Sequence, residues 1–187
     1  MDKVNIYIYT TVRGPGTKSG SYTYLLEYIT DRGPATLTKQ GELEQVTENQ
    51  ANLQVLIEAL QRLKKQCEVT IWTESRYLQQ GAEHWIHEWQ QSGWMTARKK
   101  PVANREEWEK VAELLGRHKT SFRVEQDHSY RNWIQTETEK KEQALLREEY
   151  IASFRKNLRS QLNQIDIQNA DGSVENLGEK YGQKKGN

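Results

Sequence analysis

The stretch from Thr47 to Trp94 constrains the fold more than any other part of the chain. Its first half carries a row of apolar residues at three- and four-residue steps: Leu53, Leu56, Ile57, Leu60 and Leu63. This spacing predicts a helix with one buried face. Val69, Ile71 and Thr73 then alternate with polar neighbours, which predicts a half-buried strand. Glu74 follows where that strand ends, and α/β sheets usually present functional groups from this edge.

The flanking sequence completes an α/β pattern. Residues 4–10 predict a central strand, and residues 21–29 and 35–39 predict an antiparallel pair of strands that turns at residues 31–34. Short helices are predicted for 77–94, a longer helix for 106–115 and a fifth strand for 121–125. Strands that alternate with helices in this order indicate an α/β domain with layered helices and sheet.

The last third of the chain has a different character, because Glu, Lys, Gln and Arg dominate it. We divide the chain into a domain at 1–135, an amphipathic helix at 136–168 and a flexible tail at 169–187. The helix carries one apolar row: Leu146, Tyr150, Phe154, Leu158 and Leu162. This row either folds back on its own domain or faces a protein partner or a second copy of the chain.

Composition excludes some classes of function. The net charge of the 187 residues is +1, so only local clusters could attract nucleic acid. No apolar run approaches the roughly 20 residues of a membrane span, so we expect no membrane association. Cys67 is the single cysteine, which fits a reducing compartment. We therefore expect a soluble, cytoplasmic protein.

Several short motifs resemble type 1 ribonuclease H. They are a C-E-V strand followed by T-E-S at residues 73–75, W-I-H-E-W at 85–89, and G-W at 93–94. The first strand, the glycine-rich turn at 14–16 and the basic segment at 96–104 extend the resemblance to residues 4–132. The resemblance implies an RNase H-like fold, which is a mixed five-stranded sheet flanked by helices. In this chain a long C-terminal helical extension follows it.

The resemblance also implies four carboxylates that hold two divalent metal ions. In this sequence Thr11 stands at the first of these positions, Asn52 at the second, Glu74 at the third and Thr136 at the fourth. Neutral oxygens are poor substitutes because magnesium needs anionic ligands. We therefore expect a catalytically degenerate member, a pseudoenzyme without a cofactor, in which Glu74 is only a weak candidate metal ligand.

Nucleic-acid binding has more support than cleavage. Arg98, Lys99 and Lys100 resemble the basic handle of the family, and Thr47 and Asn49 match its minor-groove contact. Three functions remain open. The chain is a binding module for an RNA–DNA hybrid, another duplex or a protein within a larger assembly; a purely structural interaction subunit; or an active Mg²⁺-dependent endonuclease with rearranged ligands. The candidates for such ligands, besides Glu74, are Glu48, Asp127, His128 and Glu137.

Overall fold

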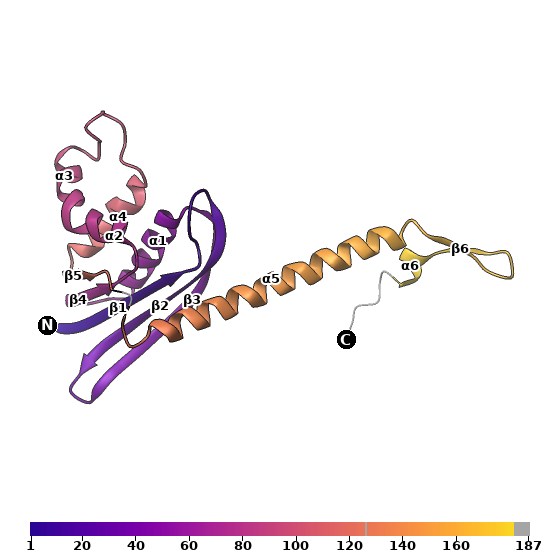
Figure 1. The fold of residues 1–187 in the computed structure, drawn as a ribbon, viewed down its shortest axis with the longest axis horizontal. Coiled ribbons are helices and arrows are strands. Elements are labelled where there is room, and N and C mark those ends of the chain that lie inside the picture. The colour runs from indigo at the N-terminus through magenta and orange to yellow at the C-terminus, as the bar shows by residue number, and fades with distance from the viewer. Residues whose placement is uncertain (126, 182–187) are drawn as a thin grey trace. The chain divides into compact units, whose positions relative to one another are not determined.

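A computed structural model describes residues 1–125 and 127–181 (Figure 1). The described chain divides into two compact units, Met1–Glu142 and a second unit that begins at Gln143. We describe each unit by itself. No helix in the described ranges is both long and apolar enough to cross a membrane.

A mixed five-stranded sheet forms the centre of the first unit, with strand order β3-β2-β1-β4-β5. Strands β1, β2 and β3 are antiparallel, whereas β4 pairs in parallel with β1 and with β5. The predicted α/β fold is thus confirmed. The bounds are β1 Asp2–Thr10, β2 Lys18–Thr30, β3 Gly33–Val46, β4 Cys67–Trp72 and β5 Lys119–Arg123.

Strand β3 is much longer than the strand predicted at residues 35–39. It lies at the edge of the sheet, and most of its side chains are exposed. An exposed edge strand does not require alternating apolar residues, so its polar sequence gave little signal.

The helix predicted from the leucine row is α1, Glu48–Gln61, and it covers the sheet with Leu53, Leu56 and Leu60 fully buried. A capping box fixes its start, since the Thr47 side chain accepts from the Gln50 N–H and the Gln50 side chain accepts from the Thr47 N–H. Further helical segments follow: α2 Arg76–Gln80, the π-helical turn η1 Gly81–Trp85, α3 Ile86–Gln91 and α4 Arg105–Leu115.

The parallel pairing of β1 and β4 determines where the candidate site lies. Because the two strands run in the same direction and are neighbours, Thr11 and Glu74 follow them at the same edge of the sheet. The N-terminus of α1 reaches this edge as well, since Glu48 bonds to the turn after β1.

The long C-terminal helix is α5, Arg131–Leu162, so it begins and ends earlier than the predicted range of 136–168. Beyond it lie strands β6 Asp166–Gln168 and β7 Val174–Asn176, which form a hairpin, and helix α6 Leu177–Tyr181. Part of the range predicted as a flexible tail therefore has secondary structure. Residues 182–187 lie outside the described residues, and the three-part division of the chain stays a prediction.

Candidate nucleic-acid site

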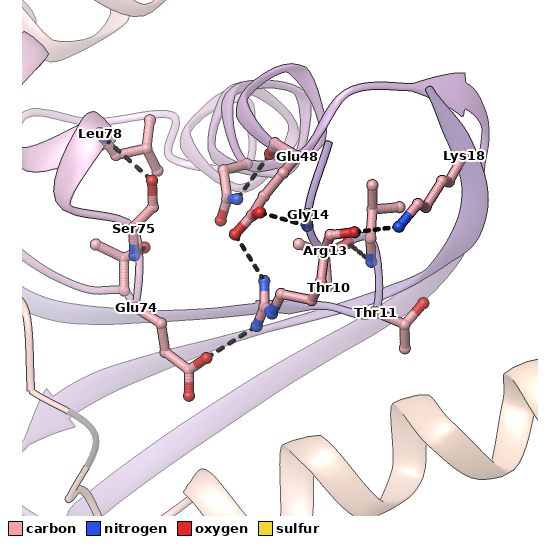
Figure 2. Close-up of polar contacts among 12 residues, drawn as sticks. Thr10, Thr11, Arg13, Gly14, Lys18, Glu48, Glu74, Ser75 and Leu78 are labelled. Carbon is pink, nitrogen blue, oxygen red and sulfur yellow. Dashed lines mark hydrogen bonds and ion pairs between the residues drawn. The ribbon is translucent and has the colours of Figure 1, made fainter. Parts of the chain in front are cut away.

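Glu74 is held in place by the turn that joins β4 to α2. The Ser75 N–H donates to Thr73 Oγ1 at 3.0 Å, and the Ser75 side chain accepts from the Leu78 N–H at 3.2 Å (Figure 2). The second contact caps α2. The backbone on both sides of Glu74 is thus fixed, and its carboxylate projects from the edge of the sheet.

Two arginines contact the Glu74 carboxylate, one at each oxygen. Arg13 Nη2 lies 2.8 Å from Oε2, and Arg131 Nη2 lies 3.6 Å from Oε1. Arg13 also lies 3.9 Å from Glu48, so it stands between two carboxylates, as Figure 2 shows. The guanidinium of Arg13 further packs over the ring of Tyr9, 5.3 Å from its centroid. Two positive and two negative charges cancel within this group, which we call the Glu74 cluster: Arg13, Glu48, Glu74 and Arg131.

The glycine-rich turn closes onto the first turn of α1. Gly14 and Gly16 have positive φ angles of 77° and 78°, which glycine adopts at little cost. The Gly14 N–H donates to Glu48 Oε2 at 2.8 Å, and Lys18 Nζ donates to the Arg13 carbonyl at 2.7 Å. The turn thereby brings Arg13 to Glu74.

Thr11 does not face Glu74. Its hydroxyl donates to Glu142 of α5 at 3.1 Å and accepts from the Ser21 N–H at 2.9 Å. In Figure 2 its side chain points away from Arg13 and Glu48. Asn52 is buried and donates to the Glu48 carbonyl at 2.8 Å, a contact within α1. Both side chains are neutral, and both are engaged in structural hydrogen bonds.

The sequence placed Thr136 at the site, and the structure places Arg131 there instead. On α5 the buried side chains are Ile134 and Thr138. Thr136 lies midway between them, which turns it to the opposite side of the helix, and it is exposed. Arg131 lies about one turn before Ile134 on the buried face, which explains how it reaches Glu74.

The donor set does not fit a pair of divalent cations. Across residues 1–125 and 127–181, no group of three or more His, Cys, Asp or Glu side chains is placed to hold a metal ion. Glu74 is already paired with two guanidinium groups, which would repel a cation. Glu48 bonds to Gly14, and Glu137 pairs with Lys140. Glu48 and Glu137 are thus engaged by other groups, and within the described residues the alternative ligands form no metal-holding group with Glu74.

His128 lies beside the cluster in an aromatic group that the sequence did not indicate. Its ring centroid is 4.7 Å from that of Tyr7 and 5.9 Å from that of Trp72. Burial and the nearby charge of Arg131 lower the pKa of His128, which favours the neutral form of the ring. Together with Trp72, Glu74 and Arg131 it lines a small hollow at this edge of the sheet.

The basic segment predicted to bind nucleic acid lies at the tip of a turn between α3 and α4. Thr96 closes this turn, since its N–H donates to the Lys100 carbonyl at 2.8 Å and its carbonyl accepts from the Lys99 N–H at 2.8 Å. Arg98, Lys99 and Lys100, which we call the basic tip, are all exposed. Within the described part of the chain, none of their side chains forms an ion pair or a hydrogen bond.

The tryptophans before the basic tip pack into the domain. Trp89 is the hub of the group, with ring centroids 5.6 Å from Trp85, 6.2 Å from Trp94 and 5.5 Å from the fully buried Trp108. The Val102 N–H donates to the Trp94 carbonyl at 3.0 Å and closes the base of the loop. Trp85, Trp89 and Trp94 are partly buried, and with Trp108 they form the base of the loop that carries the basic tip.

The two other predicted contacts differ from each other. The Thr47 side chain is engaged in the capping box of α1, whereas Asn49 in the first turn is exposed. Asn49 is thus available for a ligand, and Thr47 acts mainly on the helix.

Comparison with known proteins agrees with this geometry. Residues 2–144 match the family profile described as RNase H. Ribonuclease HI of Neisseria meningitidis is 36% identical over 125 residues, which cover 66% of this chain and 83% of that protein. The chain belongs to the RNase H family. A ribonuclease H of Bordetella pertussis is 41% identical over 92 residues, covering 49% of this chain and 59% of that protein.

Solved structures share the RNase H fold. LC9-RNase H1, a type 1 RNase H with the type 2 active-site motif, superposes with a TM-score of 0.64 at 21% identity, covering 76% of this chain and 72% of that one. A second match falls on the C-terminal part: residues 130–174 match a profile described as a bacterial protein of unknown function, DUF896.

The apolar row predicted on the C-terminal helix lies in the second unit, which begins at Gln143. Leu146, Tyr150, Phe154 and Leu158 are exposed, and Leu162 is partly buried. No described element of that unit covers the row.

Proposed function

We propose that this RNase H domain binds duplex nucleic acid, RNA–DNA hybrid above all, and does not cleave it by a metal-dependent route. The Glu74 cluster supports the absence of metal-dependent cleavage. A carboxylate between two guanidinium groups is already charge-neutralised, and a divalent cation would have to displace both.

Two other positions of the site also argue against metal binding. Thr11 and Asn52 are neutral and engaged in structural hydrogen bonds, so they add no negative charge beside Glu74. Magnesium gives up its hydration shell reluctantly and is usually bound through carboxylates. The described residues therefore offer less than the anionic charge that two such ions require.

The basic tip supports the binding of duplex nucleic acid. Three adjacent cations on a short, closed turn, without partners in the described chain, are suited to phosphate contacts. Two structures that share the fold support a duplex as ligand. The foamy viral protease-reverse transcriptase is described in complex with RNA/DNA hybrid in one (TM-score 0.52) and with dsDNA in the other (TM-score 0.57).

Fluorescence anisotropy with a labelled RNA–DNA hybrid at several salt concentrations tests binding. We expect affinity to fall steeply with salt, and the triple change Arg98→Ala, Lys99→Ala, Lys100→Ala to reduce the log–log slope by about 2–3, since each phosphate contact contributes about 0.9. A matched control triple is Lys64→Ala, Lys65→Ala, Lys119→Ala. It removes three exposed cations, two shortly before β4 and one at the first residue of β5, at the end of the strands opposite Glu74. We expect it to change the slope little.

Two outcomes would favour the other functions. Absence of hybrid binding at low salt would favour the function of a purely structural interaction subunit. Cleavage of the hybrid with Mg²⁺ or Mn²⁺, abolished by Glu74→Ala, would show an active nuclease with rearranged ligands.

A further inference from the structure

The first unit holds a second hollow, which lies at the end of the strands opposite Glu74 and has a volume of about 410 Å³. The Cys67 N–H, at the first residue of β4, donates to the ring of His118 and places the hollow at this end of the sheet. Its lining includes three cations, one histidine and two leucines: Leu63, Lys64, Lys110, Leu114, Arg117 and His118. No carboxylate of the described residues lines it, and we call it the basic hollow.

Helix α4 and the turn after it position three of these groups. Lys110 lies one turn before Leu114 on α4, so the two side chains lie on the same side of the helix. The N–H groups of Arg117 and His118 donate to the carbonyls of Leu114, at 3.2 Å, and Leu115, at 3.0 Å. This closed turn leads directly into β5, so secondary structure fixes its backbone on both sides.

The ring of His118 offers a hydrogen-bond donor without a charge. Its Nδ1 accepts from the Cys67 N–H at 3.2 Å, so the proton of the neutral ring lies on Nε2. Burial lowers the pKa of His118 and the nearby charge of Arg117 adds to this effect, which favours the neutral form. Within the described residues Nε2 has no hydrogen-bond partner, so it is available to a ligand.

The basic hollow keeps a positive charge when its ion pairs are counted. Glu113 pairs with Lys110, at 2.7 Å, and also with Arg117, so one carboxylate serves two cations. Lys64 Nζ donates to the Gln61 carbonyl at 3.4 Å and forms no ion pair within the described residues. Three positive charges and one negative charge leave a net charge of +2 beside the hollow. A cleft lined by charges of one sign raises the local concentration of counter-ions.

The helix dipoles account for only part of this arrangement. Lys64 and Arg117 lie just after the C-terminal ends of α1 and α4, where cations are stabilising. Lys110 lies in the middle of α4, and the dipole effect is confined to the first and last turns of a helix. The neutral ring of His118 carries no charge on which a dipole could act. A bound anion explains all four side chains together.

We infer that the basic hollow binds a short phosphate chain, either the triphosphate group of a nucleotide or free inorganic polyphosphate. Lys64, Lys110 and Arg117 supply the positive charge, and the guanidinium group also matches phosphate oxygens with paired N–H donors. A water molecule takes up about 30 Å³ in the liquid, so the hollow has room for more than one phosphate group. The inference goes beyond nucleic-acid binding, because no lining residue belongs to the Glu74 cluster or the basic tip.

Calorimetric titration of the full chain with sodium tripolyphosphate and, separately, with ATP, both in excess EDTA, tests this inference. We expect saturable binding at one site per chain. Lys110→Ala with Arg117→Ala should weaken it at least about tenfold, because two charge-assisted contacts to phosphate are lost. Binding of tripolyphosphate as tight as that of ATP would identify a free phosphate chain as the ligand. Tighter binding of ATP would show that the nucleoside contributes.

Arg105→Ala with Lys140→Ala is the matched control. It removes one arginine and one lysine that pair with Glu109 and Glu137 at the same helical spacings, and neither cation lines the hollow. The net charge falls by the same amount, so we expect the affinity for phosphate chains to stay nearly unchanged. An equal loss in both double variants would show nonspecific attraction of anions and would overturn the inference.

Nuclear magnetic resonance of the histidine rings gives a readout that needs no variant. Tripolyphosphate should shift the ring resonances of His118 and raise its pKa, because a nearby anion favours the protonated form. The resonances of His84, which is exposed on η1, should stay unchanged. Absence of saturable binding of both compounds, or an unshifted His118, would overturn the inference.

Hybrid binding by the Lys110→Ala, Arg117→Ala variant separates this inference from the proposed function. The variant retains the basic tip, so we expect it to bind hybrid with the same salt slope while its affinity for phosphate chains falls. The two proposals can therefore fail independently.

Discussion

The Glu74 cluster and the basic tip both concentrate charge on the RNase H domain, yet they differ in what those charges contact. In the cluster each carboxylate oxygen of Glu74 has a guanidinium partner, and the four charges cancel. At the basic tip three cations project from a closed turn without partners in the described chain. Whether a charged side chain is available to a ligand therefore depends on its contacts with other charged groups more than on how many charged residues lie together.

The largest expected effect concerns the support of the basic tip. Trp108 is fully buried, its Nε1 donates to the Tyr77 hydroxyl at 2.7 Å, and it packs against Trp89. We expect Trp108→Ala to lower the free energy of unfolding by roughly 3–5 kcal/mol. Urea denaturation measures this loss, and Trp133→Ala, at an exposed tryptophan, is the control with little effect. Equal losses would show that the aromatic group is not the base of the loop.

The second prediction converts the cluster into a metal site. Removing the charge of Arg13 with Arg13→Ser, and placing acids at three nearby positions with Thr11→Asp, Asn52→Glu and Arg131→Asp, should raise Mg²⁺ affinity at least about tenfold, or 1.4 kcal/mol. Calorimetric titration measures the change. The control set carries Thr136→Asp in place of Arg131→Asp and should gain less, because Thr136 lies on the exposed side of α5. Equal gains would contradict our assignment of Arg131 to the site.

The third prediction frees the arginines of the cluster. Glu74→Gln removes the charge that Arg13 and Arg131 share, so the cluster gains one net positive charge. We expect hybrid affinity to rise by a few-fold and the free energy of unfolding to fall by about 1 kcal/mol, since the pairs are partly exposed. Anisotropy and urea denaturation measure the two effects. Glu137→Gln removes a carboxylate paired with Lys140, and it should alter neither quantity appreciably.

The smallest effect is a pH dependence of stability. Burial lowers the pKa of His128, assisted by Arg131, and likewise the pKa of His118, assisted by Arg117. The unfolded chain therefore binds more protons than the folded chain near pH 6. The contribution of these two neutral histidines to the free energy of unfolding is complete above the ordinary histidine pKa of about 6.5. It is lost as the pH falls toward their lower pKa values in the folded chain. We expect the double variant His118→Gln, His128→Gln to show a flatter stability profile between roughly pH 7 and 5 in urea denaturation. An unchanged slope would contradict this assignment.

The sequence predicted the fold well wherever burial imposes a pattern. The leucine row gave α1 and the alternation at Val69 and Ile71 gave β4, because both elements face the core. The sequence predicted too short a strand at β3, an edge strand with polar residues, and the wrong bounds for α5, whose exposed half gives no tertiary signal.

The candidate site was predicted less completely. The position of Glu74 at the end of β4 follows from the strand pattern. The matching of Thr11 and Asn52 to acid positions stays a prediction from the resemblance to RNase H. The contact of Arg131 with Glu74 does not follow from the strand pattern, because it depends on the rotation of α5 about its axis, and the resemblance to the family pointed to Thr136 instead. Arg13 stood at a recognisable position, but its bridge between Glu48 and Glu74 depends on the path of the glycine-rich turn.

The central claim is that this domain binds hybrid without a divalent metal ion and does not cleave it. The most direct test measures hybrid affinity in excess EDTA and in Mg²⁺ at matched ionic strength, and then recovers the RNA strand on a denaturing gel. We expect the two affinities to agree and the RNA to be recovered intact, because Arg13 and Arg131 already neutralise Glu74. Tighter binding in Mg²⁺ together with cut RNA, both lost in Glu74→Ala, would contradict it.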